Sequence, residues 1–198
     1  MSDRSVFVAY NGSPLLSGEH YSWQVRVWDQ QSKASAWSTL AHFQMGMLAS
    51  SAWKAAWIES SQEMENAELP AHYFRKTFFS KGKIRSATAF LTAHGLYEAQ
   101  LNGKRIGEDY LSPGWTSYNH RLPYQTYDVT SLLREGENAV GMIVGNGWYR
   151  GYLAWENHKD IYGKKLGVLA QLEITYTDGH KEFVVSDETW KVGEGSIL

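Results

Sequence analysis

Apolar and polar residues alternate along much of this chain, and this period of two predicts β-strands. The alternation is longest at 166–176, where Val168, Ala170, Leu172, Ile174 and Tyr176 fall on one face of a single strand. Residues 138–144 are apolar without alternation, which predicts a strand buried on both faces. Shorter alternating runs predict further strands at 72–79, 84–93, 95–101, 124–129 and 181–186, with Trp190 in a last short strand.

Turn signals separate these strands at short intervals. Asn102-Gly103 is typical of a tight hairpin turn, because both residue types adopt positive φ readily. Residues 130–133 predict one helical turn, and no segment keeps the 3.6-residue period of a longer helix. The pattern therefore predicts an all-β fold, with a jelly-roll β-sandwich at 49–198 that has under about a tenth of its residues in helix. We expect its buried residues to include Tyr97, Leu101, Val140, Ile143, Leu169 and Leu172.

Residues 1–48 carry a separate pattern and form the first predicted domain. Alternation at 21–28, a polar turn at 29–35 and a returning run at 37–45 predict a hairpin, and 6–10 predicts a third strand before Asn11-Gly12. Trp23, Val25 and Trp37 would lie on or near one apolar face. A small sheet with bare edges is marginally stable alone. We expect it either to fold back on the sandwich or to form a homodimer, and we favour the homodimer.

Composition narrows the classes of function. The 198 residues are 43% hydrophobic with a formal charge of -2, which excludes wholesale disorder and argues against a nucleic-acid partner. No window of 18 apolar residues exists, so no membrane partner is predicted. Cysteine is absent, which removes disulfides, thiolate metal ligands and cysteine nucleophiles. The first residues lack the apolar core of a signal peptide, and the sequence leaves the compartment undetermined.

Nine Trp and twelve Tyr give a high aromatic content with two explanations. Aromatic side chains suit a β-sandwich core, and flat rings also stack on the apolar faces of sugars. Loops that combine rings with amide and carboxylate groups favour the sugar interpretation. The segment Gly145-Asn146-Gly147 also predicts that the backbone passes close to a bulky group there. The candidate carbohydrate-binding residues are Trp115, Tyr118, Asn119, Asn146, Trp148, Trp155 and Glu156.

Calcium is a possible cofactor, since it takes six to eight oxygen ligands and the same loops are rich in oxygen-bearing side chains. No set can be assigned as a site, so we predict no metal site and no other cofactor. The residues considered as calcium ligands are Asp109, Asn119, Glu156, Asn157 and Asp160.

Several sequence motifs, taken in order along the chain, indicate a resemblance to a known family. Residues 21–29 and 36–38 look like the last strands of a fibronectin-III-like domain. Residues 95–107, 111–116, 124–130, 145–149, 170–173 and 187–191 are similar to the N-terminal region of bacterial α-L-rhamnosidases of glycoside hydrolase family 78. The resemblance covers nearly the whole chain.

The resemblance implies a parent enzyme that removes terminal α-L-rhamnose with inversion, using two carboxyl groups on a downstream (α/α)6 catalytic domain. Nothing in this chain reads as a helical barrel, so we predict no catalytic residues and an accessory fragment whose partner is that domain. His94 is expected to be packed or hydrogen-bonded rather than a catalytic base. Both ends are expected to be cut from a longer protein, because a complete fibronectin-III-like domain needs about 90–100 residues.

Three roles remain open from the sequence. The chain can be a structural support that packs on the catalytic domain, with its loop aromatics as interface anchors. It can be a module that recognises a rhamnose-containing glycan within the same enzyme. The weaker alternative is a free-standing rhamnose-binding or lectin-like protein.

Overall fold

The computed structural model describes residues 6–60, 70–153, 155 and 158–194. The chain divides into two compact units, Met1–Trp53 and Lys54–Leu198. Within the described residues the helical segments are one four-residue α-helix, α1 (Gly147–Arg150), and two three-residue 3-10 turns, η1 (Ser50–Ala52) and η2 (Thr130–Leu132). The predicted all-β class is therefore confirmed, and no described helix is long and apolar enough to cross a membrane.

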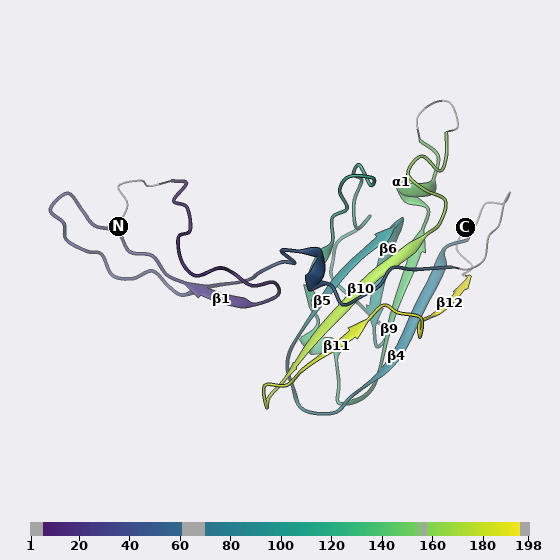
Figure 1. Ribbon diagram of the computed structural model, residues 1–198. Helices are drawn as coiled ribbons and strands as arrows, with labels where there is room; N and C mark the ends of the chain where they lie inside the picture. Colours follow the sequence, from purple (N-terminus) through teal and green to yellow (C-terminus); the bar gives the residue numbers. More distant parts are fainter. Residues whose placement is uncertain (1–5, 61–69, 154, 156–157, 195–198) are drawn as a thin grey trace. The chain divides into compact units, whose positions relative to one another are not determined.

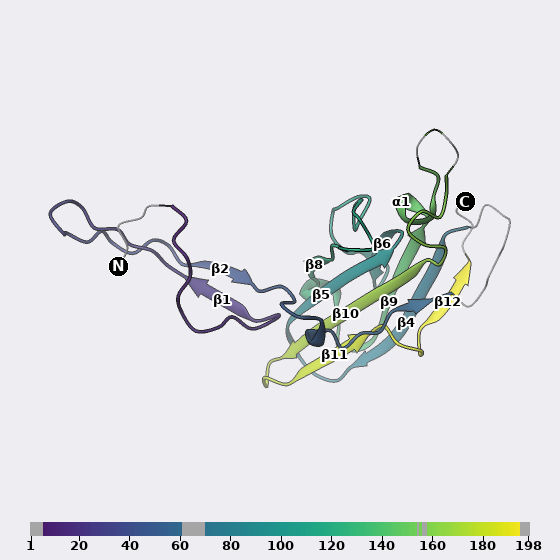
Figure 2. The same ribbon diagram turned by 45° about the horizontal axis from the view of Figure 1, so that its top comes forward.

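The first unit is built on an antiparallel pair, β1 (His20–Trp23) and β2 (Ala41–Gln44), in which Trp23 pairs with Ala41 (Figure 2). The turn predicted at 29–35 is present, and Asp29 Oδ1 accepts hydrogen bonds from the backbone N–H of Gln31 and Lys33. The third strand predicted at 6–10 is wrong. Those residues are exposed and outside any strand, and Phe7 has φ 53°, which interrupts extended backbone.

The expected common face for Trp23, Val25 and Trp37 stays a prediction, because Val25 and Trp37 lie outside β1 and β2. The Arg26 guanidinium lies 4.8 Å from the Trp28 ring centre and 4.6 Å from that of Trp37. Arg26 therefore makes a cation–π contact with each of these two rings.

The second unit is a sandwich of two antiparallel sheets (Figure 1). One sheet has the order β11-β10-β5-β8, with β3 also paired to β10, and the other has the order β12-β4-β9-β6-β7. The first sheet comprises β3 (Ile58–Glu59), β5 (Ile84–His94), β8 (Gln125–Asp128), β10 (Gly167–Tyr176) and β11 (Lys181–Val185). The second comprises β4 (His72–Ser80), β6 (Leu96–Leu101), β7 (Lys104–Arg105), β9 (Gly136–Gly145) and β12 (Lys191–Glu194).

The hydrophobic core lies between these sheets, and alternation predicted much of it. The inward face of β10 is buried at every predicted position from Val168 to Tyr176. Tyr97, Leu101 and Val140 are buried from the other sheet. Ile143 and Leu169 are only partly buried, because they occupy the opposite face of their strands. For the same reason β9 buries alternate residues, and the prediction that both of its faces are buried is wrong.

The hairpin predicted at Asn102-Gly103 joins β6 to β7, with φ values of 53° and 77°. The Asn102 side chain also ties three segments together. Its Oδ1 accepts from the N–H of Ala139, while its Nδ2 donates to Leu132 O and Asn138 Oδ1. This turn therefore anchors β9 and η2 as well as closing its own hairpin.

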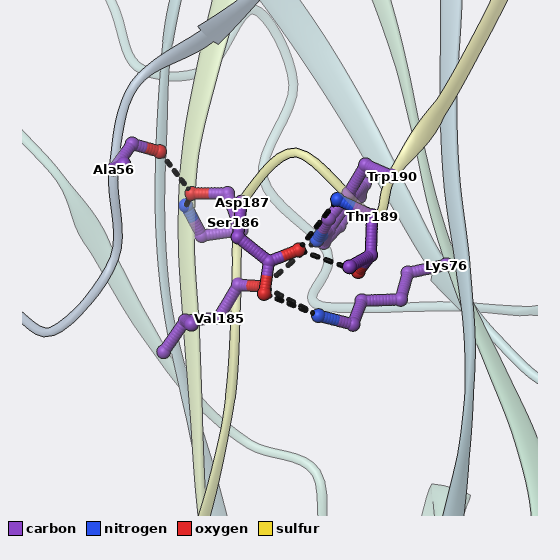
Figure 3. Close-up of polar contacts among 8 residues, drawn as sticks. Ala56, Lys76, Val185, Ser186, Asp187, Thr189 and Trp190 are labelled. Carbon is purple, nitrogen blue, oxygen red and sulfur yellow. Dashed lines mark hydrogen bonds and ion pairs between the residues drawn. The ribbon is translucent and has the colours of Figure 1, made fainter.

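A polar clamp closes the corner between β11 and β12 (Figure 3). Lys76 lies on β4, which pairs with β12. Its Nζ donates to Asp187 Oδ2 at 2.8 Å and to Val185 O of β11 at 3.2 Å. Asp187 Oδ1 accepts from the backbone N–H and the hydroxyl of Thr189. Trp190 precedes β12 rather than lying in it, and its Nε1 donates to Val185 O at 2.8 Å. The clamp therefore joins β11, an edge strand of the first sheet, to β4, which lies beside the edge strand β12 of the second.

Candidate functional site

One end of the sandwich gathers the loops that carry most of the candidate residues. Strand pairing sets this end, because Gly167 at the start of β10 pairs with His94 at the end of β5. In the other sheet Leu96 at the start of β6 pairs with Gly145 at the end of β9. We call this the loop end. It receives α1 directly after β9, as Figure 1 shows.

Gly147 lets α1 begin against the neighbouring strand. Its φ is 49°, and a Cβ added there would overlap the Leu96 side chain. The close passage predicted for Gly145-Asn146-Gly147 is therefore confirmed at Gly147, whereas a Cβ added at Gly145 would meet nothing within 4 Å. The single helical turn of α1 contains Trp148 and the buried Tyr149, and so brings both rings to the loop end.

A series of aromatic rings runs through this end, and we call it the aromatic ladder. Trp57 stacks on His94 with ring centres 4.0 Å apart and planes 11° from parallel. His94 stacks in turn on Tyr149, at 4.7 Å and 3°. Tyr118 meets Tyr149 edge-on at 5.3 Å and 73°. Tyr118 also packs on Tyr162 at 5.0 Å.

The ladder ends at two parallel indoles, which we call the Trp115–Trp148 platform. Their ring centres lie 6.1 Å apart with planes 7° from parallel. Trp115 Nε1 donates a hydrogen bond to Tyr162 Oη at 3.2 Å, which links the platform to the ladder. Trp115 is 61% exposed, so a broad apolar ring surface meets water there. Flat rings fixed in this way suit stacking against the apolar face of a sugar.

The electrostatics of the loop end favour uncharged groups. Burial lowers the pKa of His94, and the Nδ1 of this ring is buried without a hydrogen-bond partner in the described structure. Burial also raises the pKa of Tyr118 and Tyr149, with smaller contributions from Tyr162 and Glu59 respectively. Neutral rings therefore prevail along the ladder at neutral pH, and His94 is packed, as the sequence predicted.

Other candidate residues lie elsewhere or have other tasks. Asn146 Oδ1 accepts from Nε and Nη2 of the buried Arg150, at 2.8 and 2.5 Å, so this oxygen serves the protein interior. Asn119 is exposed. Trp155 is 99% exposed and makes no ring contact with the platform in the described structure. Glu156 lies outside the described residues.

The carboxylates considered as calcium ligands do not converge in the part of the chain that the structure describes. Asp109 Oδ2 accepts from the Tyr127 hydroxyl at 3.0 Å, and the backbone N–H of Asp160 donates to Arg150 O. Asn157 lies outside the described residues. The described residues contain no group of three or more His, Asp or Glu side chains placed to hold a metal.

Sequence reasoning did not single out Trp57, Tyr149 and Tyr162 as site residues. Tyr149 stood within the phrase at 145–149, and His94 stood directly before Gly95. Their common position depends on strand register and on the path of the chain after α1, which no local pattern contains.

Comparison with known proteins matches both parts of the chain to families. Residues 82–198, more than half of the chain, match the family model described as "Alpha-L-rhamnosidase N-terminal domain". Residues 1–49 match the model described as "Rha78A-like, N-terminal immunoglobulin domain". An alpha-L-rhamnosidase of Formosa agariphila is 37% identical over an alignment of 197 positions, which covers 96% of this chain and 21% of the relative.

Solved structures give the same result. The crystal structure of native α-L-rhamnosidase from Aspergillus terreus matches with a TM-score of 0.91 and 39% identity, over 98% of this chain and 23% of that chain. A lectin from Pleurotus ostreatus matches 71% of this chain and 35% of its own, with a TM-score of 0.51 and 26% identity. The resemblance to the N-terminal region of α-L-rhamnosidases is confirmed, with residues 1–49 matching an immunoglobulin domain model. The chain spans about a fifth of the relatives from Formosa agariphila and Aspergillus terreus.

Proposed function

Because this chain belongs to the family of alpha-L-rhamnosidase N-terminal domains, we propose that it acts as a non-catalytic accessory region of a longer α-L-rhamnosidase. The observation that best supports this proposal is the family match, together with the small fraction of each relative's length that the chain covers. In this proposal the chemistry belongs to a downstream (α/α)6 catalytic domain, and this region supports that domain.

The Trp115–Trp148 platform gives the accessory role a second part, which is substrate recognition. An exposed indole held parallel to a second indole offers a preformed stacking surface, so little ordering accompanies binding. The neutral ladder beneath it suits an uncharged ligand such as a rhamnose-containing glycan. The likeness of the sandwich to a protein described as a lectin supports this part of the proposal.

The non-catalytic part is tested by assaying the purified chain on an aryl α-L-rhamnoside. We expect no turnover above buffer, because hydrolysis with inversion needs two carboxyl groups roughly 6.5–9.5 Å apart across the sugar. Activity that follows the protein peak through a second purification step would refute this part.

The recognition part is tested by titrating L-rhamnose into the chain with calorimetry, with and without calcium. We expect weak binding, with a Kd on the order of 1 mM, because one small sugar covers little surface. Trp115→Ala should weaken binding at least about tenfold, a loss of about 1.4 kcal/mol. Trp23→Ala is the matched control, since that indole is similarly exposed, at 50%, in the first unit.

The two parts of the proposal separate cleanly in this design. Binding that Trp115→Ala weakens and Trp23→Ala leaves intact supports recognition at the platform. Binding that survives Trp115→Ala contradicts the assignment of the platform. If the folded wild-type chain binds no rhamnose with or without calcium, recognition is refuted and the supporting role alone remains.

A further inference from the structure

His94 occupies an unusual place for a histidine. It is the last residue of β5, and its ring is nearly parallel to Trp57 on one side and to Tyr149 on the other. Both neighbours stack within 4.7 Å of its centre, so they must lie on opposite faces of the imidazole. The ring is therefore held as the middle layer of a three-ring stack.

The hydrogen-bonding capacity of this imidazole is left partly unused. Its Nδ1 is buried without a partner in the described structure. An unsatisfied buried polar atom is costly, so a compensating gain is expected wherever one persists. At His94 the favourable interaction that offsets this cost is ring stacking on Trp57 and Tyr149, so the side chain serves packing rather than proton transfer.

Tyr149, the next ring, has little freedom of its own. A Cβ added at Gly163 would overlap the Tyr149 hydroxyl, so the backbone closes on the tip of this side chain. The edge of Tyr149 meets Tyr118, which packs on Tyr162. Tyr162 in turn accepts the hydrogen bond from Trp115 Nε1. An unbroken series of direct contacts therefore connects Tyr149 to the exposed indole.

We propose that His94 is a positioning residue that sets the orientation of the Trp115–Trp148 platform through Tyr149, Tyr118 and Tyr162. This inference rests on the proposed recognition role only for its functional consequence. Its structural content concerns the ladder itself, where rigid supporting contacts hold a binding surface in its productive geometry. What the position requires is a flat ring, and the imidazole nitrogens are dispensable.

The primary test follows the indole N–H of Trp115 by NMR in the full chain labelled with [15N]Trp. The Trp115 resonance is assigned by its disappearance in Trp115→Phe. His94→Leu, which fills space without a flat ring, should move or broaden this resonance. His94→Phe, which restores a flat ring, should leave it at the wild-type position. An unchanged Trp115 resonance in folded His94→Leu would overturn the proposal.

Two further variants keep the test decisive. Val184→Ala removes buried volume on β11, away from the loop end, and controls for a general loss of stability; it should leave the Trp115 resonance in place. Trp57→Leu removes the outer ring of the stack at a position that is 39% exposed, so folding should survive. It should move the Trp115 resonance in the same direction as His94→Leu. If His94→Leu does not fold, an unmoved resonance in Trp57→Leu overturns the proposal.

Rhamnose titration of the same variants separates this proposal from the proposed function. We expect His94→Leu to weaken binding about three- to tenfold and His94→Phe to restore it. If the resonance shifts as expected while the wild-type chain binds no rhamnose, the positioning role of His94 stands and sugar recognition fails. If rhamnose binds equally to folded His94→Leu and to wild type, the functional consequence of the positioning is refuted.

Discussion

Replacing Leu172 with Ala measures how tightly the sandwich core is packed. Leu172 is fully buried on β10, between Ala89 of β5 and Val184 of β11. The change removes three buried carbon atoms, worth about 2.4 kcal/mol at about 0.8 kcal/mol each. If roughly 40 Å³ stays empty, the cavity adds about 1 kcal/mol. We therefore expect the free energy of unfolding to fall by about 3–4 kcal/mol.

Urea denaturation of the full chain, followed by far-UV circular dichroism, checks this value. Leu169→Ala is the matched control, because the same chemical change is made on the same strand at a partly buried position on the opposite face. We expect about 1–2 kcal/mol there. The slope of the transition must stay constant between variants for the comparison to hold. A loss under about 1 kcal/mol at Leu172 would refute the inward placement of this side chain.

Three further predictions concern the turn, the clamp and the first unit. Asn102→Ala should lower the free energy of unfolding, measured by urea denaturation, by about 2–4 kcal/mol, because alanine is strained at positive φ and the Ala139 N–H loses its acceptor. Asn102→Gly should lower it less, because glycine adopts positive φ without strain. Burial alone would raise the pKa of Asp187, but hydrogen bonds from Lys76 and Thr189 outweigh it and lower the pKa. This stabilisation is fully present above about pH 4 and is lost progressively as pH falls through the lowered pKa of the folded state, so in thermal melts Asp187→Asn should be less destabilising at pH 3 than at pH 7. The homodimer stays a prediction: sedimentation at high micromolar concentration should show a dimer for the full chain and a monomer for a version that starts at Ala49, and monomers for both would contradict it.

The sequence by itself determined the class of fold and most of its strands. Period-two alternation is a local property, so it located β10 and its inward face without knowledge of any neighbour. The hairpin at Asn102-Gly103 followed from residue types that tolerate positive φ. The same local signals misplaced the segment at 6–10, where apolar residues do not find a strand to pair with.

The family resemblance also came from the sequence alone, because its motifs are local runs of residues that lie in strands such as β6, β8 and β10 and in the turns beside them. Trp115, Tyr118 and Trp148 were named as candidates from their loops, and the structure places all three on the ladder or its platform. Whether they bind sugar stays a prediction. The loop sequences showed that aromatic rings would be present, but not which face of each ring would be exposed to solvent.

Only the tertiary structure decided how the rings meet. Trp57, His94 and Tyr149 are dozens of residues apart, and their stacking follows from the pairing of Gly167 with both Glu59 of β3 and His94 of β5. The bond between Asn146 and the buried Arg150 is by contrast local, because it joins the two ends of the single turn of α1. Side-chain contact across strands depends on register and loop path, which are set by the packing of the whole sandwich and not by any local period.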